Sequence, residues 1–251
     1  MQFLSSQRVL IEHDVWGIGR PVLLVHGFAS NARVNWINTS WTKTLEQAGY
    51  APITFDNRGH GRSSKFYEPK CYSIELMADD AKQLLDHLGH DRVSVMGYSM
   101  GARIAAAFAN RYPSVVVALV LAGLAENLMA DTSNAEAIAT ALEAGSVEEV
   151  TDPVVRGYRV FAEQTGSDRQ ALAACIRGSR RKIGGDELQG IRAPVLVVAG
   201  SEDKIAGPVA PLVDKLPNAE GLVLPRRDHM QAVGDRTFKQ AVVKFFDKHA
   251  A

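Results

Sequence analysis

The sequence predicts a doubly wound α/β fold, in which a mostly parallel sheet is flanked by helices on both faces. Two observations carry this prediction. Short apolar runs without polar alternation recur along the chain, and such runs are typical of strands buried on both faces. Between them lie segments whose apolar residues recur at helical spacing. Strands and helices that alternate in this way build a parallel sheet, and 251 residues, 46% of them hydrophobic, suffice for one large domain of this kind.

The strands are predicted in order from the N-terminus. Residues 3–15 supply one or two antiparallel strands at an edge of the sheet. The later strands are continuous apolar runs, located at residues 21–27, 51–59, 92–99, 116–123, 193–200 and 221–225.

Three segments predict helices. The apolar residues of 73–89 trace one helical face, with Ser73 as the N-cap and Gly89 just past the end. Residues 100–111 are rich in alanine, so this helix can lie close to its sheet, and it stops before Pro113. The C-terminal segment has an apolar stripe made of Phe238, Ala241, Val242, Phe245 and Phe246.

One segment interrupts the alternation. Residues 125–185 contain no convincing strand and are interpreted as a helical insertion. We therefore predict a core domain of residues 1–124 and 186–251 and a small helical cap of residues 125–185. The cap is divided by charge, because residues 126–152 carry seven acidic side chains and residues 156–182 carry seven basic ones. We expect these two halves to pair across the cap surface; the alternative is that some arginines face an anionic group of the substrate.

Composition disfavours several classes of protein. Lys plus Arg and Asp plus Glu number 28 each, so the net charge is zero, whereas proteins that bind nucleic acid or an anionic membrane usually carry a basic excess. Cys71 and Cys175 lack the spacing of a metal site and are expected to be free thiols. No signal peptide or membrane span is apparent. We expect a cytoplasmic protein, monomeric or homodimeric, without metal, cofactor, nucleic-acid partner or membrane attachment.

The stretch "VMGYSMGA" (95–102) contains the pattern G-x-S-x-G, with Gly97, Ser99 and Gly101. The pattern is weak alone, but here a predicted strand precedes it and a predicted helix follows it, as a nucleophile elbow requires. At such an elbow the flanking residues must be tiny, because strand and helix nearly touch. The serine hydroxyl then stands above the sheet, with the backbone N–H of Met100 pointing toward the same space.

A serine hydroxyl is a poor nucleophile without a base, and His229 is the candidate base. Among seven histidines, His229 follows the last predicted strand, which places it at the sheet edge that also carries Ser99. Glu202 and Asp203, just beyond the strand at 193–200, are candidate carboxylates to orient the imidazole.

Several motifs together resemble the α/β-hydrolase superfamily, in particular its small, cap-bearing, carboxylesterase-like members. They are "HGFAS" (26–30), "FDNRGHGRSS" (55–64), "GYSMGA" (97–102) and "PVLVVAGSEDKI" (194–205), followed by the His229 loop. The resemblance favours Asp203 over Glu202, since an aspartate three residues after Gly200 matches the acid loop of such folds. It also implies that the backbone N–H of Phe28 joins that of Met100 in an oxyanion hole, and that His26, Arg58 and His60 are structural.

The resemblance implies a serine hydrolase that cleaves a small-molecule carboxylic ester through an acyl-enzyme, with Ser99, His229 and Asp203 as its triad. Three other reactions share the same frame, namely lactone hydrolysis, carbon–carbon bond hydrolysis and perhydrolysis. Epoxide hydrolases and dehalogenases are disfavoured, because they place an aspartate at the elbow. The alternative from another class is a ligand-sensing protein that retains a hydrolase site.

Overall fold

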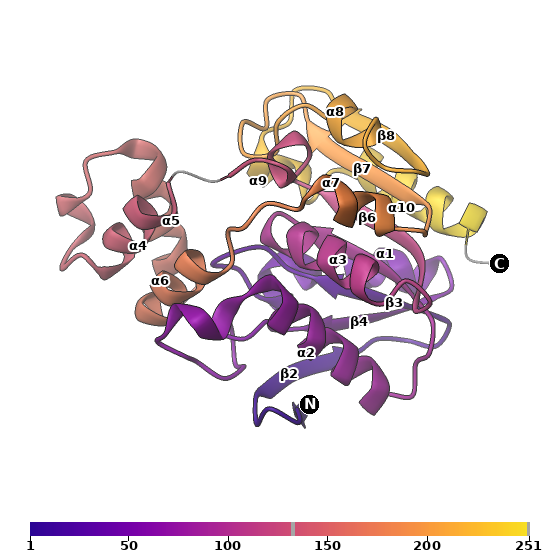
Figure 1. Cartoon of the computed structure of the whole chain (residues 1–251), viewed down its shortest axis with the longest axis horizontal. Coiled ribbons are helices and arrows are strands. Elements are labelled where there is room, and N and C mark those ends of the chain that lie inside the picture. Colours follow the sequence, from indigo (N-terminus) through magenta and orange to yellow (C-terminus); the bar gives the residue numbers. More distant parts are fainter. Residues whose placement is uncertain (132–133, 250–251) are drawn as a thin grey trace.

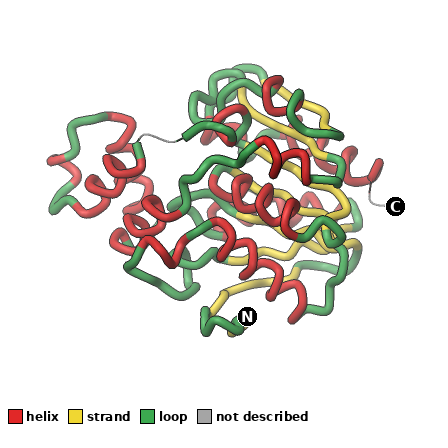
Figure 2. Tube along the Cα trace, viewed as in Figure 1, coloured by secondary structure: helices red, strands yellow, loops and turns green. Residues whose placement is uncertain are grey.

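The computed structural model describes residues 1–131 and 134–249, and its centre is a sheet of eight strands (Figures 1 and 2). The order in the sheet is β1-β2-β4-β3-β5-β6-β7-β8. β1 and β2 are antiparallel at one edge, and every pair from β4 onward is parallel. The strands span Gln2–Leu4, Leu10–Val15, Arg20–Val25, Tyr50–Phe55, Val93–Tyr98, Val116–Ala122, Val195–Gly200 and Ala219–Leu224. The predicted doubly wound α/β fold is confirmed, including the antiparallel edge.

Helices cover both faces of the sheet (Figure 2). α2 (Ile74–His87) and α3 (Met100–Arg111) pack on one face, whereas α1 (Trp41–Gln47) and α10 (Arg236–His249) pack on the other. Side chains that alternate along a strand therefore enter different cores, which explains why all six residues of β5 are buried. Two short helices, α8 (Ala210–Val213) and α9 (His229–Ala232), flank β8 in the chain.

The strand predicted over 51–59 ends earlier, at Phe55. Asp56 starts a turn, because its carboxylate accepts hydrogen bonds from the backbone N–H groups of Ala32 (2.9 Å) and Arg62 (2.8 Å). α1 has no counterpart among the helices that the sequence pattern predicted. The π-helical turn Arg33–Ile37 and the short helix Pro69–Tyr72 complete this part of the chain.

Between β6 and β7 the described residues form helices and loops but no strand. α4 (Ala135–Glu143), α5 (Pro153–Gln164) and α6 (Arg169–Gly178) project from one end of the sheet, and α7 (Gly185–Gly190) returns to it (Figure 1). Single turns at Glu126–Leu128 and Val147–Glu149 join them. Asp152 and Asp168 cap α5 and α6 by accepting from backbone N–H groups of the first turn. The apolar core of the sheet continues into α4 and α6, and the domain boundaries at 124/125 and 185/186 stay a prediction.

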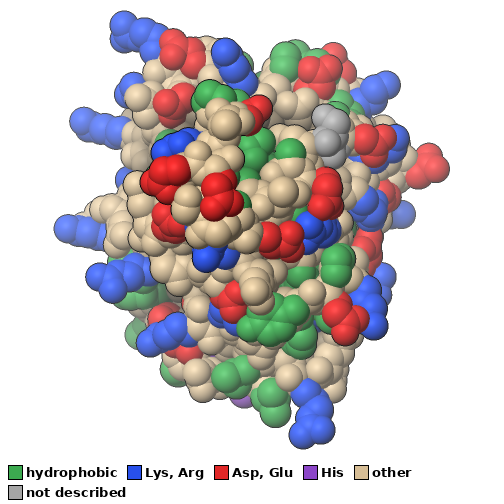
Figure 3. Space-filling model, turned by 90° about the vertical axis from the view of Figure 1, so that its left-hand side faces the viewer, with side chains coloured by type: hydrophobic (Ala, Val, Ile, Leu, Met, Phe, Trp, Pro, Cys, Tyr) green, Lys and Arg blue, Asp and Glu red, His purple; other side chains and the backbone are tan. Residues whose placement is uncertain are grey.

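Acidic and basic side chains lie next to one another on the cap side of the molecule (Figure 3). Arg177 pairs with Glu136 at 2.7 Å and Glu143 at 2.5 Å, and Lys182 pairs with Asp131 at 2.7 Å. Exposed pairs of this kind each contribute about 0–1 kcal/mol to stability. The two charged halves of the cap therefore do meet, although not every base takes part.

Candidate active site

The turn from β5 to α3 holds Ser99 in a strained conformation. Its φ is +57° and its ψ is −118°, a region that residues other than glycine seldom occupy and that recurs at functional sites. A Cβ on Gly97 would lie 2.2 Å from the carbonyl oxygen of Gly101, and one on Gly101 would lie 1.9 Å from that of Val25. Both positions therefore require glycine, because strand and helix touch on either side of the serine.

Three side chains that are far apart in the sequence meet at this turn. His229 Nε2 lies 3.1 Å from Ser99 Oγ, and His229 Nδ1 lies 2.9 Å from Asp203 Oδ2. The three residues follow the C-terminal ends of β5, β8 and β7, which emerge at one edge of the parallel sheet. The geometry brings together the residues that the sequence analysis selected.

The hydrogen bonds of Asp203 indicate which ring nitrogen of His229 carries the proton. Asp203 is fully buried, and its Oδ1 also accepts from the backbone N–H groups of Ile205 (3.1 Å) and Ala206 (3.0 Å). Because a carboxylate only accepts, His229 Nδ1 carries the proton and Nε2 is left to accept from the Ser99 hydroxyl. Glu202, the other candidate acid, is exposed.

Two backbone N–H groups near Ser99 make no hydrogen bond within the described chain, those of Phe28 and Met100. Met100 is the first residue of α3, where the helix offers no internal acceptor for its N–H. Phe28 follows β3 and lines the same cavity as Ser99. A pair of unsatisfied donors beside a candidate nucleophile is the arrangement that stabilises a developing oxyanion.

The loop that carries Phe28 is fixed from several sides. Asn35 Oδ1 accepts from the Gly27 N–H at 3.0 Å, and both ring nitrogens of His26 bond the backbone, Nδ1 to Gly27 O and Nε2 to the Asn57 N–H. Burial lowers the pKa of His26, so the ring is neutral and serves as a structural link. Sequence reasoning missed Asn35, whose position eight residues after Gly27 carries no recognisable motif.

His60 is a second buried ring behind the site, 5.8 Å from Phe28 between ring centroids. Burial, followed by the neighbouring His26, lowers the pKa of His60 to about 3. Its position and neutral state agree with the structural role that the resemblance implied.

Tyr98 contacts His229, and the sequence analysis also missed this residue. Its hydroxyl donates to the backbone oxygen of His229 at 2.5 Å, and its ring lies 5.3 Å from the imidazole. Burial, with Asp203 and Asp228 nearby, holds the pKa of Tyr98 well above its usual value, so the hydroxyl stays a donor. The variable position between Gly97 and Ser99 gave no signal for this role. Asp228 itself is exposed and caps α9 through the N–H groups of Met230 and Gln231.

A cavity of about 1080 Å³ opens over Ser99 between the sheet edge and the cap. Apolar side chains from the cap and its entry segment line it, including Leu124, Val160 and Phe161. Thr165, which caps the C-terminus of α5, also contacts the loop that carries Phe28, since its Oγ1 donates to Ala29 O at 2.9 Å. The site is therefore a covered, mainly apolar pocket with a few polar groups, typical of a small-molecule site.

No group of three or more His, Cys, Asp or Glu side chains in residues 1–131 and 134–249 is arranged to hold a metal ion. None of the helices in this part of the chain is long and apolar enough to cross a membrane.

Fold and site together define a hydrolase scaffold with a serine at its elbow, and comparison with known proteins agrees with this class. The family model for the alpha/beta hydrolase fold matches residues 20–145. The chain belongs to this family.

Relatives that match four fifths or more of the chain are named for different reactions. A non-heme haloperoxidase of Rhodococcus erythropolis is 28% identical and covers 97% of this chain and 98% of its own. A 3-oxoadipate enol-lactonase of Acinetobacter baylyi is 26% identical over 80% of this chain and 79% of its own. The crystal structure of an enol-lactonase from Burkholderia xenovorans superposes with a TM-score of 0.85 at 19% identity, over 98% of this chain and 100% of that one.

Proposed function

We propose that the protein is a serine hydrolase that cleaves carboxylic esters through an acyl-enzyme intermediate. The observation that carries the proposal is the continuous contact from Asp203 through His229 to Ser99, at 2.9 and 3.1 Å. A neutral imidazole that accepts from a serine hydroxyl, with its other nitrogen held by a buried carboxylate, is the arrangement that activates serine.

The reaction follows from these contacts. Ser99 Oγ attacks the ester carbonyl while His229 Nε2 takes the hydroxyl proton, and Asp203 stabilises the resulting imidazolium. The carbonyl oxygen becomes an oxyanion that accepts from the N–H groups of Phe28 and Met100. His229 returns the proton to the leaving alcohol, and a water molecule activated by His229 then releases the acid from Ser99.

The proposal is tested by labelling with a fluorophosphonate and mapping the modified peptide, together with hydrolysis of p-nitrophenyl esters. We expect the label on Ser99, and Ser99→Ala to lose at least about a thousandfold in kcat. Ser6→Ala is the matched control, because Ser6 is exposed and lies outside the cavity. Undiminished hydrolysis by Ser99→Ala would rule the proposal out, and tight ligand binding without turnover would favour a sensing role.

Lactone hydrolysis is the second candidate. A lactone is an internal ester, so the same attack by Ser99 opens the ring, and the relation to a 3-oxoadipate enol-lactonase favours it. A comparison of kcat/KM for matched esters and lactones separates the two. Perhydrolysis and carbon–carbon bond hydrolysis belong in the same substrate panel.

Epoxide hydrolysis is disfavoured by the chemistry of the elbow. An epoxide hydrolase from Mycobacterium tuberculosis is 37% identical, but over only 38% of this chain. Ring opening by Ser99 would leave a stable ether, whereas a carboxylate nucleophile leaves an ester that water can hydrolyse. Cytoplasmic location and a monomeric or homodimeric state stay predictions.

A further inference from the structure

The cavity over Ser99 is more basic than the protein as a whole. The chain has no net charge, yet the charged side chains that line the cavity, among the residues that the structure describes, are four cations and one acid: Arg103, Arg156, Arg180, Lys204 and Asp131. The acid is already engaged, since Asp131 pairs with Lys182 at 2.7 Å. The cavity that Ser99 lines therefore holds an excess of positive charge.

Arg103 is the cation of this group whose position is fixed by hydrogen bonds. It lies on α3 one turn after Ser99, and its side chain is buried. Its guanidinium donates to three backbone carbonyls, those of Asn127 (3.1 Å), Leu128 (3.3 Å) and Arg181 (2.5 Å). Carbonyl oxygens satisfy N–H groups but do not neutralise the charge, and within the described chain no carboxylate pairs with it.

Lys204 is connected to the same segment. Asn127, whose carbonyl accepts from Arg103, donates through Nδ2 to the carbonyls of Lys204 (3.5 Å) and Ile205 (3.1 Å). Lys204 also directly follows Asp203 in the chain. Arg103, through its side chain, and Lys204, through its backbone carbonyl, therefore both contact Asn127, and both residues line the cavity.

Two of these cations, Lys204 and Arg156, make no ion pair within the part of the chain that the structure describes. No carboxylate in the described part of the chain lies within ion-pair distance of Lys204 or Arg156, and Arg156 makes a 3.5 Å contact with the carbonyl of Val150. The acid that senses Arg156 is Glu148, whose pKa is lowered first by the Ser146 hydroxyl and to a smaller extent by Arg156. Other cap bases are engaged, for example Arg177 with Glu136 and Glu143. Arg177 thus pairs outside the cavity, whereas Arg156 and Lys204 line it without an ion pair to a described carboxylate.

We propose that Arg103, Arg156 and Lys204 form an anion subsite that binds a carboxylate of the substrate, so that the preferred ester carries a second, ionised carboxylate. This inference rests on the proposed ester hydrolysis. Arg103 supplies a charge held rigidly by carbonyls, and Lys204 and Arg156 supply side chains that can close on the anion. Burial, followed by the nearby Arg180 and Arg181, lowers the pKa of Arg103 to about 10, so it is charged at neutral pH.

The test compares substrates that match in length and differ in charge. Monomethyl adipate against methyl hexanoate places the extra carboxylate in the acyl part, and acetoxyacetate against ethyl acetate places it in the alcohol part. We expect one charged member to be preferred by about tenfold or more in kcat/KM, which corresponds to about 1.4 kcal/mol. The preference should weaken as salt rises, because the Debye length shrinks from about 10 Å at 0.1 M to about 3 Å at 1 M.

The decisive variants are Lys204→Met, Lys204→Glu and Arg156→Met. Each should lower the charged-to-neutral ratio of kcat/KM several-fold, and Lys204→Glu should lower it most. Lys215→Met is the matched control, since Lys215 is an exposed lysine outside the cavity. It removes the same charge and should keep the ratio of the wild type. Arg103 is left out because it also holds the segments that join cap and core.

The outcomes separate this inference from the proposed function. If both members of each pair are hydrolysed equally, and Ser99→Ala abolishes both activities, the subsite is refuted and the ester hydrolase stands. A preference that survives both Lys204→Glu and Arg156→Met also refutes the subsite. If wild type hydrolyses neither member and Ser99 takes no fluorophosphonate label, the proposed function itself fails.

Discussion

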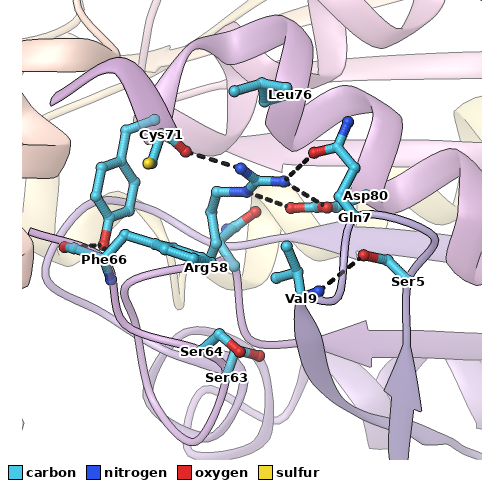
Figure 4. Close-up of polar contacts among 12 residues, drawn as sticks. Ser5, Gln7, Val9, Arg58, Ser63, Ser64, Phe66, Cys71, Leu76 and Asp80 are labelled. Carbon is cyan, nitrogen blue, oxygen red and sulfur yellow. Dashed lines mark hydrogen bonds and ion pairs between the residues drawn. The ribbon is translucent and has the colours of Figure 1, made fainter. Parts of the chain in front are cut away.

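The buried ion pair between Arg58 and Asp80 offers a stability test of the region behind the active site (Figure 4). Arg58 Nε lies 2.6 Å from Asp80 Oδ2, and Arg58 Nη2 lies 2.7 Å from Asp80 Oδ1. The two side chains are only 3% and 2% exposed. With Asp80→Asn the guanidinium stays buried but loses its carboxylate, and it keeps the carbonyl of Cys71 (2.8 Å) and a longer contact with Gln7 (3.4 Å).

The expected cost follows from leaving one charge buried without its partner. Removal of one member of a buried pair costs about 3–5 kcal/mol of unfolding free energy. A chain of this size loses roughly 2–4 °C of Tm per kcal/mol, so Asp80→Asn should lower Tm by roughly 6–20 °C. The double variant Arg58→Met/Asp80→Leu removes both charges and fills the space with apolar atoms. It should therefore be more stable than Asp80→Asn.

Unfolding in urea, followed by circular dichroism, measures these differences. Asp86→Asn is the matched control, because Asp86 pairs with Lys82 on the exposed side of α2 and that carboxylate is 54% exposed. Its loss should cost about 1 kcal/mol or less. The reasoning is refuted if Asp80→Asn is as stable as Asp86→Asn, or if the double variant is less stable than the single one.

Two further predictions concern residues around the triad. Tyr98→Phe removes the donor to the His229 carbonyl, so kcat should fall about fivefold with KM unchanged. Tyr112→Phe is the control, because the Tyr112 hydroxyl bonds Asp79 outside the cavity. An unchanged kcat in Tyr98→Phe would contradict the positioning role. His60, with its pKa lowered from 6.5 to about 3, binds fewer protons folded than unfolded. Between these two pH values, the contribution of His60 should lower the free energy of unfolding as pH falls, by up to about 1.4 kcal/mol per pH unit. Unfolding free energies of His60→Gln from pH 7 to pH 4 should thus show a shallower slope than wild type, and parallel curves would be the contrary result.

The meeting of Ser99 and His229 could be predicted from the sequence because it depends on a property of all parallel sheets. The C-terminal ends of parallel strands share an edge, so residues just after β5, β7 and β8 emerge at the same edge whatever their distance along the chain. The glycines at 97 and 101 mark a turn with no room for a side chain. Features that follow from backbone rules of this kind can be predicted from the sequence.

Contacts that depend on how separate segments pack could not be predicted from the sequence in this way. Tyr98 reaches the carbonyl of His229 only because the loop after β8 returns along the sheet edge to the end of β5, although β6 and β7 separate the two strands. The sequence shows that Asn35 has a side-chain amide, but it does not show that this amide contacts Gly27. Likewise, the charges of the cap predict pairing in general, while the choice of which cations face the cavity depends on the rotation of α5 and of the segment after α6.

Arg103 connects the position of the cap to the geometry of the nucleophile. Its backbone N–H donates to the carbonyl of Ser99, while its side chain holds Asn127 and Leu128, which enter the cap, and Arg181, which leaves it. α3 packs closely against β3 and β5 at this turn, because Gly97 and Gly101 leave no room for a Cβ. Arg103 thus connects the cap to the turn that carries Ser99. A substrate anion drawn to Arg103 would therefore be bound at a fixed offset from Ser99 Oγ, so that one preferred spacing between ester and carboxylate is expected.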